Sequence, residues 1–265
     1  MSNLTNSRSF ANNRPKGMSR QTLRIWGMLF LAAGIAGQSI IQNVILNIQS
    51  ISSADFGKLL EDNNNFVMAA VAFLLQLLMA CAIPIFTFLL VDGFQRTSSV
   101  KNYALRVAGV ALLSEIPYNL AMTGKWIDLD SRNPMIAMAL GMVMLIIYDH
   151  YSGKSFKNVM IKILVVVFSI LWVEMLRIND GMAIVIMISS LWFMRKNRSL
   201  QVFGGCVIMF VCSAIPFNPT YWLAPIVFLT VHFYNEEQGE ENKVLNYLMY
   251  PGLLLAIGLI AKYAI

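Results

Sequence analysis

Residues 82–121 read AIPIFTFLLVDGFQRTSSVKNYALRVAGVALLSEIPYNLA, which is two apolar stretches joined by a short charged turn. Each stretch has the composition of a membrane helix. Glu115 falls about 14 residues past Lys101, or roughly 21 Å along a helix, so its side chain is too deep to reach the near membrane surface. An ionised group at that depth needs a partner, a proton or a watery cavity. We therefore expect two membrane helices with a polar site beside them.

The rest of the chain is as apolar as this pair. Its 265 residues are 57% hydrophobic and 13% charged, with a mean hydropathy of +0.63, which predicts an integral membrane protein surrounded by lipid. The net charge of +6 lies in short loops and not along one face, so it indicates membrane topology, and we expect no nucleic-acid partner. The three cysteines lie in apolar runs without a CxxC pair or a nearby histidine, so we expect neither a metal site nor a disulfide.

The apolar runs predict an all-α, polytopic transmembrane helical bundle with about nine spans. The candidate spans are 25–46, 67–91, 101–122, 134–148, 157–174, 180–194, 201–215, 219–233 and 245–262. Residues 1–20 form a polar, basic tail that we expect to be disordered and cytoplasmic, and residues 21–265 form one transmembrane domain. With this orientation most loop lysines and arginines lie inside, and the loop at 47–65 lies outside and is long enough for a short interfacial helix.

The turn between the two opening stretches is basic and rich in serine and threonine. Asp92 and Arg96 end one span, Lys101 begins the next, and Arg106 follows about one and a half turns later. Arginine forks, lysine charge and the free N–H groups of a helix start can together receive phosphate groups. The alternative is an ordinary cytoplasmic loop whose charge only sets topology.

Polar residues gather at the far end of the same hairpin. Ser114, Glu115, Tyr118 and Asn119 lie on neighbouring helix faces, and they predict either a functional polar pocket or a buried structural network. His232 precedes a cytoplasmic loop by two residues and is a further candidate for a site role.

Asp180 lies in the segment EMLRINDG, at the start of a predicted span and near Glu174. This placement is typical of a solvated turn with a helix cap.

Several of these blocks resemble the TraX family of membrane proteins, which is associated with pilin N-acetylation in conjugation and is similar to multispanning acyltransferases. The blocks that carry the resemblance are PIFTFLLVDGFQRTSSVKNYALRV, SEIPYNLA, RINDGMAIVIMI and HFYNEEQGEENKVLNYLMYPGLL. The resemblance implies a membrane acetyltransferase of the bacterial cytoplasmic (inner) membrane that uses acetyl-CoA.

The resemblance also implies roles for the residues in these blocks. The cofactor's phosphates would be held by Asp92, Arg96, Lys101 and Arg106. Catalysis would fall to Glu115, with help from Asn119 or His232, on a protein, peptide or glycan acceptor.

The chain departs from the family pattern at two places that matter for chemistry. Gly37 and Gln38 stand where the family carries an Asp-His pair, and Gly252 and Leu253 stand where a histidine follows the Tyr-Pro pair. Glutamine cannot accept a proton, so the departures leave two alternatives open. One is a non-catalytic membrane partner in the assembly or export of another protein, and the other is a small proton-coupled transporter that uses Glu115.

Overall fold

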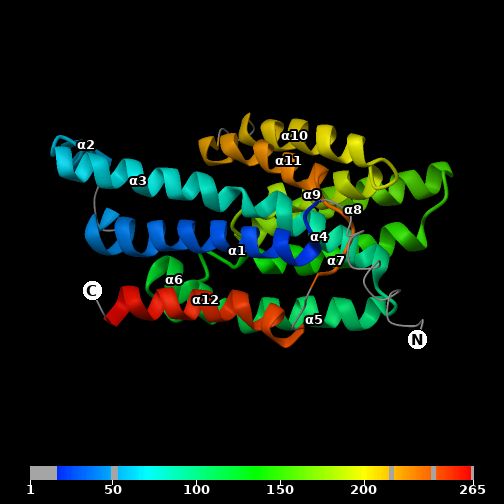
Figure 1. Cartoon of the computed structure of the whole chain (residues 1–265), viewed down its shortest axis with the longest axis horizontal. Helices are drawn as coiled ribbons and strands as arrows, with labels where there is room; N and C mark the ends of the chain where they lie inside the picture. The colour runs from blue at the N-terminus through cyan, green and yellow to red at the C-terminus, as the bar shows by residue number, and fades with distance from the viewer. Residues whose placement is uncertain (1–16, 49–52, 215–217, 240–242, 264–265) are drawn as a thin grey trace, which may run out of the picture.

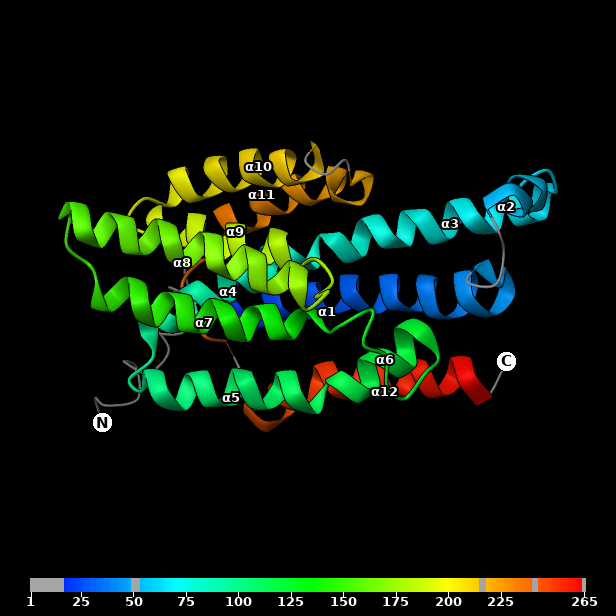
Figure 2. The ribbon, with the colours of Figure 1, turned by 180° about the vertical axis from the view of Figure 1, so that it is seen from behind.

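The computed structural model describes residues 17–48, 53–214, 218–239 and 243–263, so most of the predicted tail lies outside the described residues. These ranges contain helices and turns, with two isolated bridges and no strand. In the first half the helices are α1 (Arg20–Ala36), η2 (Gly37–Ile45), α2 (Ser53–Leu59), α3 (Asn63–Ala80), α4 (Ala82–Arg96), α5 (Val100–Leu113) and α6 (Glu115–Thr123). In the second half they are α7 (Pro134–His150), α8 (Phe156–Met175), α9 (Gly181–Phe193), α10 (Arg198–Ala214), η4 (Pro219–Val227), α11 (Phe228–His232) and α12 (Lys243–Tyr263). Most of the long helices run along the long axis of the molecule (Figures 1 and 2).

The all-α prediction is confirmed, and each of the nine predicted apolar stretches is largely helical. Four helical segments of the described chain are long and apolar enough to cross a membrane, and three shorter apolar helices accompany them. The four are Arg20–Ile45, Asn63–Arg96, Phe156–Met175 and Leu245–Tyr263. The count of nine spans and the cytoplasmic N-terminus stay predictions.

Two of the predicted spans are divided, each just before an Ile-Pro pair. The long apolar stretch breaks at Cys81, and α4 then begins as Ala-Ile-Pro; the next one breaks at Ser114, and α6 begins as Glu-Ile-Pro. A proline has no N–H to donate and crowds the preceding turn, but it is tolerated in a first helical turn. Pro84 and Pro117 therefore place a helix start where the hydrophobicity pattern predicts an unbroken span.

Helix α9 forms the centre of the bundle. Its sequence, GMAIVIMISSLWF, is apolar on every side, which is the pattern of a helix surrounded by protein. It packs against α4, α7, α8 and α10, and most of its residues are buried. By contrast α8 buries few residues and turns most of its apolar side chains outward.

On one side of the bundle, α1 packs against α3 and α12, and α12 packs against α6. A Cβ added at Gly34 of α1 would collide with Met79 of α3, and one added at Gly258 of α12 would lie 2.9 Å from the backbone nitrogen of Ala121 in α6. The π-helical η2 continues α1, and its Ser39 hydroxyl donates to the carbonyl of Ala121. These contacts need small residues, because only they let the backbones approach so closely.

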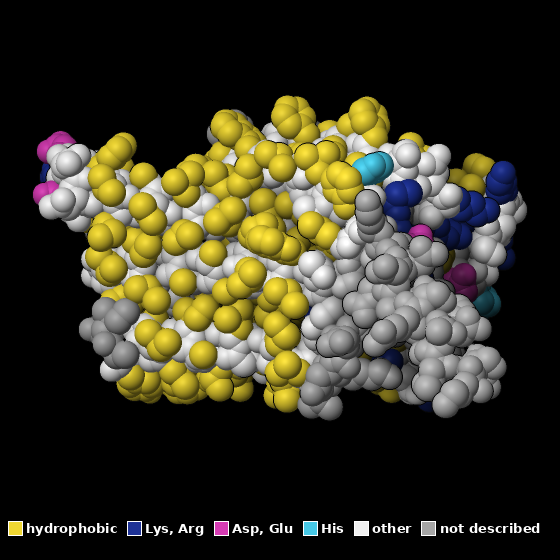
Figure 3. All heavy atoms as spheres, in the orientation of Figure 1, with side chains coloured by type: hydrophobic (Ala, Val, Ile, Leu, Met, Phe, Trp, Pro, Cys, Tyr) yellow, Lys and Arg dark blue, Asp and Glu magenta, His cyan; other side chains and the backbone are white. Residues whose placement is uncertain are grey.

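The start of α1 is joined to the loop before α12 by backbone hydrogen bonds. Met18 N donates to Phe233 O at 2.8 Å, and Arg20 N donates to Glu237 O at 2.8 Å. We call this region the arginine end. Lysine and arginine side chains gather there, whereas hydrophobic side chains cover most of the visible surface beyond it (Figure 3).

Candidate functional site

A buried carboxylate organises the arginine end. Asp92, near the end of α4, accepts hydrogen bonds from Arg20 at 2.5 Å, Arg96 at 2.8 Å and the Tyr234 hydroxyl at 2.9 Å. These bonds join α1, α4 and the loop after α11. Asp92 is therefore the shared acceptor of an internal network.

The acidic loop at residues 235–242, as far as it is described, extends this network. Glu236 accepts from Arg96 at 3.0 Å and from Arg198 at 3.3 Å. The Arg96 hydrogen bond is the main reason that the pKa of Glu236 lies below its usual range. Burial, reinforced by the nearby charge of Asp92, raises the pKa of Tyr234 to about 12, so this tyrosine stays a hydrogen-bond donor.

The other two predicted cofactor residues lie along α5. Lys101 is exposed, and Arg106 lies next to α12, with its guanidinium carbon 5.6 Å from the centre of the Tyr247 ring. The Arg106 Nε also donates to the carbonyl of Asn102 at 3.1 Å. The four predicted cofactor residues thus form two groups, one inside the Asp92 network and one at the edge of α5.

An apolar cavity of about 200 Å³ lies between α1, α4, α5, α7 and α12. Its polar lining residues include Arg24 of α1, Tyr103 of α5 and two residues of α12, Asn246 and Tyr247. Its walls are the aliphatic and aromatic side chains of α1, α4, α5 and α7. Asp180, at the start of α9, also lines it.

Glu115 belongs to a polar network at the start of α7. Its Oε2 accepts the backbone N–H of Asn133 at 3.3 Å. The Asn133 side chain, which is fully buried, donates to Ser114 Oγ at 2.6 Å and accepts from the Tyr250 hydroxyl at 2.7 Å. The SEIP block and the Tyr-Pro block, far apart in sequence, therefore meet at one asparagine.

The three predicted catalytic residues are not brought together. Asn119 is buried one turn after Glu115, and in the amide orientation that satisfies both of its groups it bonds Asp128 N and Ser131 O, each at 3.2 Å. His232 is exposed at the end of α11, next to the loop that bonds the start of α1. None of the three lines the apolar cavity or the second cavity described next.

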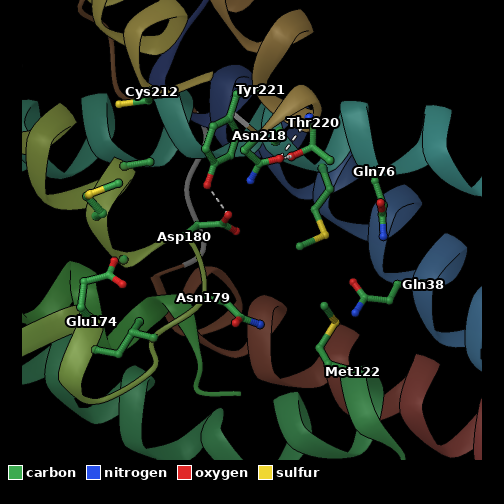
Figure 4. A pocket seen from close by; sticks show the side chains of 16 residues that line it. Gln38, Gln76, Met122, Glu174, Asn179, Asp180, Cys212, Asn218, Thr220 and Tyr221 are labelled. Atoms are coloured by element: carbon green, nitrogen blue, oxygen red, sulfur yellow. Dashed lines mark hydrogen bonds between the residues drawn. The ribbon is translucent and has the colours of Figure 1, made fainter. Parts of the chain in front are cut away.

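The second cavity has a volume of about 380 Å³ and is rich in polar side chains (Figure 4). Its polar lining residues are Gln38, Gln76, Glu174, Asn179, Asp180, Asn218, Thr220 and Tyr221. In Figure 4 the two glutamines, from η2 and α3, lie across the cavity from Asp180. No lysine or arginine is among the described residues that line it.

Asp180 sits where the two cavities meet. It lines both of them, as does Met79. Its backbone is in the left-handed region, with φ of 56°, and its side chain makes no capping bond to α9. Instead it accepts a hydrogen bond from the Tyr221 hydroxyl. The helix cap that the sequence pattern predicts at this position is therefore wrong.

Sequence reasoning missed most of this polar cavity. Gln38 was noted only as a substitute for a histidine, and Gln76 and Tyr221 were not singled out. Glutamines inside apolar runs were the available signal, because an amide in a membrane span needs a polar partner or a cavity.

Comparison with known proteins points to one family. The family model described as TraX protein matches residues 56–261, a range that contains all the sequence blocks quoted above. No curated protein and no solved structure matches the chain. Because the matched range covers most of the 265 residues, the chain belongs to the TraX family.

Proposed function

We propose that this protein is a membrane acyltransferase that moves an acetyl group from acetyl-CoA to an acceptor amine or hydroxyl. The observation that supports the proposal most directly is that an apolar cavity and a polar cavity meet at Asp180. Two substrates of different polarity could approach one another there from two sides.

The cofactor's place in this proposal is the apolar cavity. Arg24 of α1 and Tyr247 of α12 line this cavity, Arg106 lies beside Tyr247, and Lys101 is exposed on the same helix as Arg106. Cationic side chains suit the phosphates of acetyl-CoA, and an arginine can hold a phosphate with two parallel hydrogen bonds. The apolar walls suit the acetyl thioester and exclude water from it.

The Asp92 network has a supporting part in the proposal. Asp92 and Arg96 bond to each other and to neighbouring elements, so they would fix the end of α4 close to the cofactor and not contact its phosphates. This assignment differs from the expectation drawn from the sequence, in which both residues touch the cofactor.

The acceptor's place is the polar cavity. Its amide and carboxylate groups can hydrogen-bond an amine or a hydroxyl-rich acceptor. Glu115 and Asn119 lie outside the lining, on the helix that carries Tyr118, whose hydroxyl accepts from the lining residue Asn179. They would hold this wall in place, and His232 would take no part in the transfer.

A non-catalytic membrane partner is the second candidate. The observation that favours it is that no histidine is among the described residues that line either cavity. Binding of acetyl-CoA separates the two, because a partner protein has no need of the cofactor.

Calorimetry on the full-length protein in lipid nanodiscs tests the proposal. We expect acetyl-CoA to bind, Arg106→Ala to weaken binding about tenfold, and Arg106→Lys to retain part of the affinity, because lysine keeps the charge but not the planar fork. Binding should also weaken as ionic strength rises. Lys157→Ala, an exposed change on α8, is the control and should leave binding unaltered. No binding by the unmodified protein at millimolar acetyl-CoA would contradict the proposal.

A further inference from the structure

The junction of the two cavities contains one ionisable side chain. Met79 and Asp180 are the described residues that line both cavities, and of these only Asp180 can exchange a proton. Any reaction between a group in the apolar cavity and a group in the polar cavity would therefore take place beside this carboxylate.

The surroundings of Asp180 fix its direction. Asp180 has a left-handed backbone conformation at the start of α9. A Cβ added at the next residue, Gly181, would lie 2.7 Å from the Val173 side chain. The turn is thus held tightly against α8. The Tyr221 hydroxyl of η4 donates to the carboxylate. Figure 4 shows the two side chains pointing toward one another.

We propose that Asp180 is the proton acceptor of the transfer step and that Tyr221 orients it. This inference rests on the proposed function. A carboxylate serves as a general base where it lies within hydrogen-bond reach of the proton to be removed. The other acids near the site are placed less well, because Glu174 lines only the polar cavity and Glu115 lines neither.

The transfer then balances without any further reagent. The acceptor's nitrogen or oxygen forms a bond with the thioester carbonyl carbon, and its N–H or O–H proton passes to the Asp180 carboxylate. The carbon–sulfur bond breaks, and the departing thiolate takes the proton from Asp180. The products are an acetylated acceptor and CoA as the free thiol. Tyr221 keeps its proton throughout and donates a hydrogen bond to the carboxylate.

The experiment measures two quantities on full-length protein in lipid nanodiscs. Calorimetry gives the affinity for acetyl-CoA, and release of free CoA thiol gives the transfer rate, with glycinamide as the amine probe and glycerol as the hydroxyl probe. We expect Asp180→Asn to lower the rate about a hundredfold while changing the affinity less than threefold. Asp149→Asn, on the exposed end of α7, is the matched control and should keep both values.

Tyr221→Phe provides a second variant that does not depend on the folding of Asp180→Asn. It should lower the rate about tenfold at nearly constant affinity, because the carboxylate loses its orienting donor. The inference is overturned if Asp180→Asn folds and keeps the rate, if Tyr221→Phe keeps the rate, or if the unmodified protein binds acetyl-CoA yet releases no thiol with either probe. Failure of the unmodified protein to bind acetyl-CoA would instead overturn the proposed function itself.

Discussion

Asn133 connects three helices through one buried amide. Besides its bonds to Ser114 and Tyr250, its Oδ1 accepts from the backbone of Met135 at 2.9 Å and so caps α7. An unpaired buried polar group costs free energy, so each partner depends on the others. The position of Glu115 is set by this asparagine.

The change of Glu115 to glutamine or leucine tests that dependence. Glutamine keeps an oxygen that can accept the Asn133 N–H, whereas leucine leaves that N–H without its partner. We expect Glu115→Leu to lower the free energy of unfolding by about 1–3 kcal/mol more than Glu115→Gln. Unfolding in mixed detergent micelles, followed by circular dichroism, measures the difference. The same pair of changes at Glu61, an exposed residue before α3, is the control.

Equal losses of stability in the two Glu115 variants would remove this residue from the network. The sequence predicts that Glu115 needs a partner outside its own helix. The partner itself could not be predicted, because it is a backbone N–H in the connection between α6 and α7. Hydrophobic periodicity carries no information about the path of that connection.

The close contact between α6 and α12 depends on a glycine. A Cβ at Gly258 would lie 2.9 Å from the nitrogen and 3.1 Å from the Cα of Ala121, and backbone atoms cannot move aside cheaply. Gly252, earlier in the same helix, has open space where its Cβ would be. The two glycines therefore form a matched pair, because Gly258 lies in close contact with a neighbouring helix and Gly252 does not.

We expect Gly258→Ala to destabilise the protein by about 1–3 kcal/mol through overpacking. Gly252→Ala should instead leave stability unchanged or raise it by up to about 1 kcal/mol, because alanine favours the helix. Thermal unfolding of the two variants in the same detergent gives the comparison. A similar loss in both variants would mean that the close contact with Ala121 is not what makes Gly258→Ala destabilising.

The sequence predicts where the helical stretches lie better than it predicts the points at which they are divided. All the apolar stretches are largely helical, as expected, but the divisions at Cys81 and Ser114 follow from prolines that a hydropathy window averages away. The stretch at 219–233 is less regular still. It begins as the 3₁₀ helix η4, with Pro219 at its start and Pro225 inside, and only its last turn is the α-helix α11.

The lengths of the helices relative to one another explain why the role of Asp180 could not be predicted. The polar cavity around the start of α9 is lined in part by η2, α3 and α6 (Figure 4). In Figure 1, α3 and α1 continue well beyond α9 on the side of α2. A turn that would be solvated at the end of a short bundle is therefore enclosed by longer neighbours. That enclosure arises between distant segments and leaves no local pattern in the sequence.

The sidedness of the bundle decides from where each substrate would arrive. We expect the loop around Ser199 to be cytoplasmic and the helix α2, which carries the exposed Lys58, to lie outside. A single cysteine at position 58 should react with a membrane-impermeant maleimide in intact cells, and one at position 199 should react only after the membrane is opened. The protein with its three native cysteines is the control. Equal reaction at both positions in intact cells would contradict the predicted topology.

The backbone bonds between residues 18–21 and 233–238 impose an order on biosynthesis. Helix α1 leaves the ribosome first, but the segment that hydrogen-bonds its start is made about 200 residues later. At roughly 5–20 residues per second this delay is about 10–40 seconds. During that interval Arg20 has no Tyr234 or Glu237 beside it, and the nascent chain is closed at this end only after residue 238 has been made. Ribosome-bound chains that stop short of residue 233 would therefore keep this end open to proteases and chaperones.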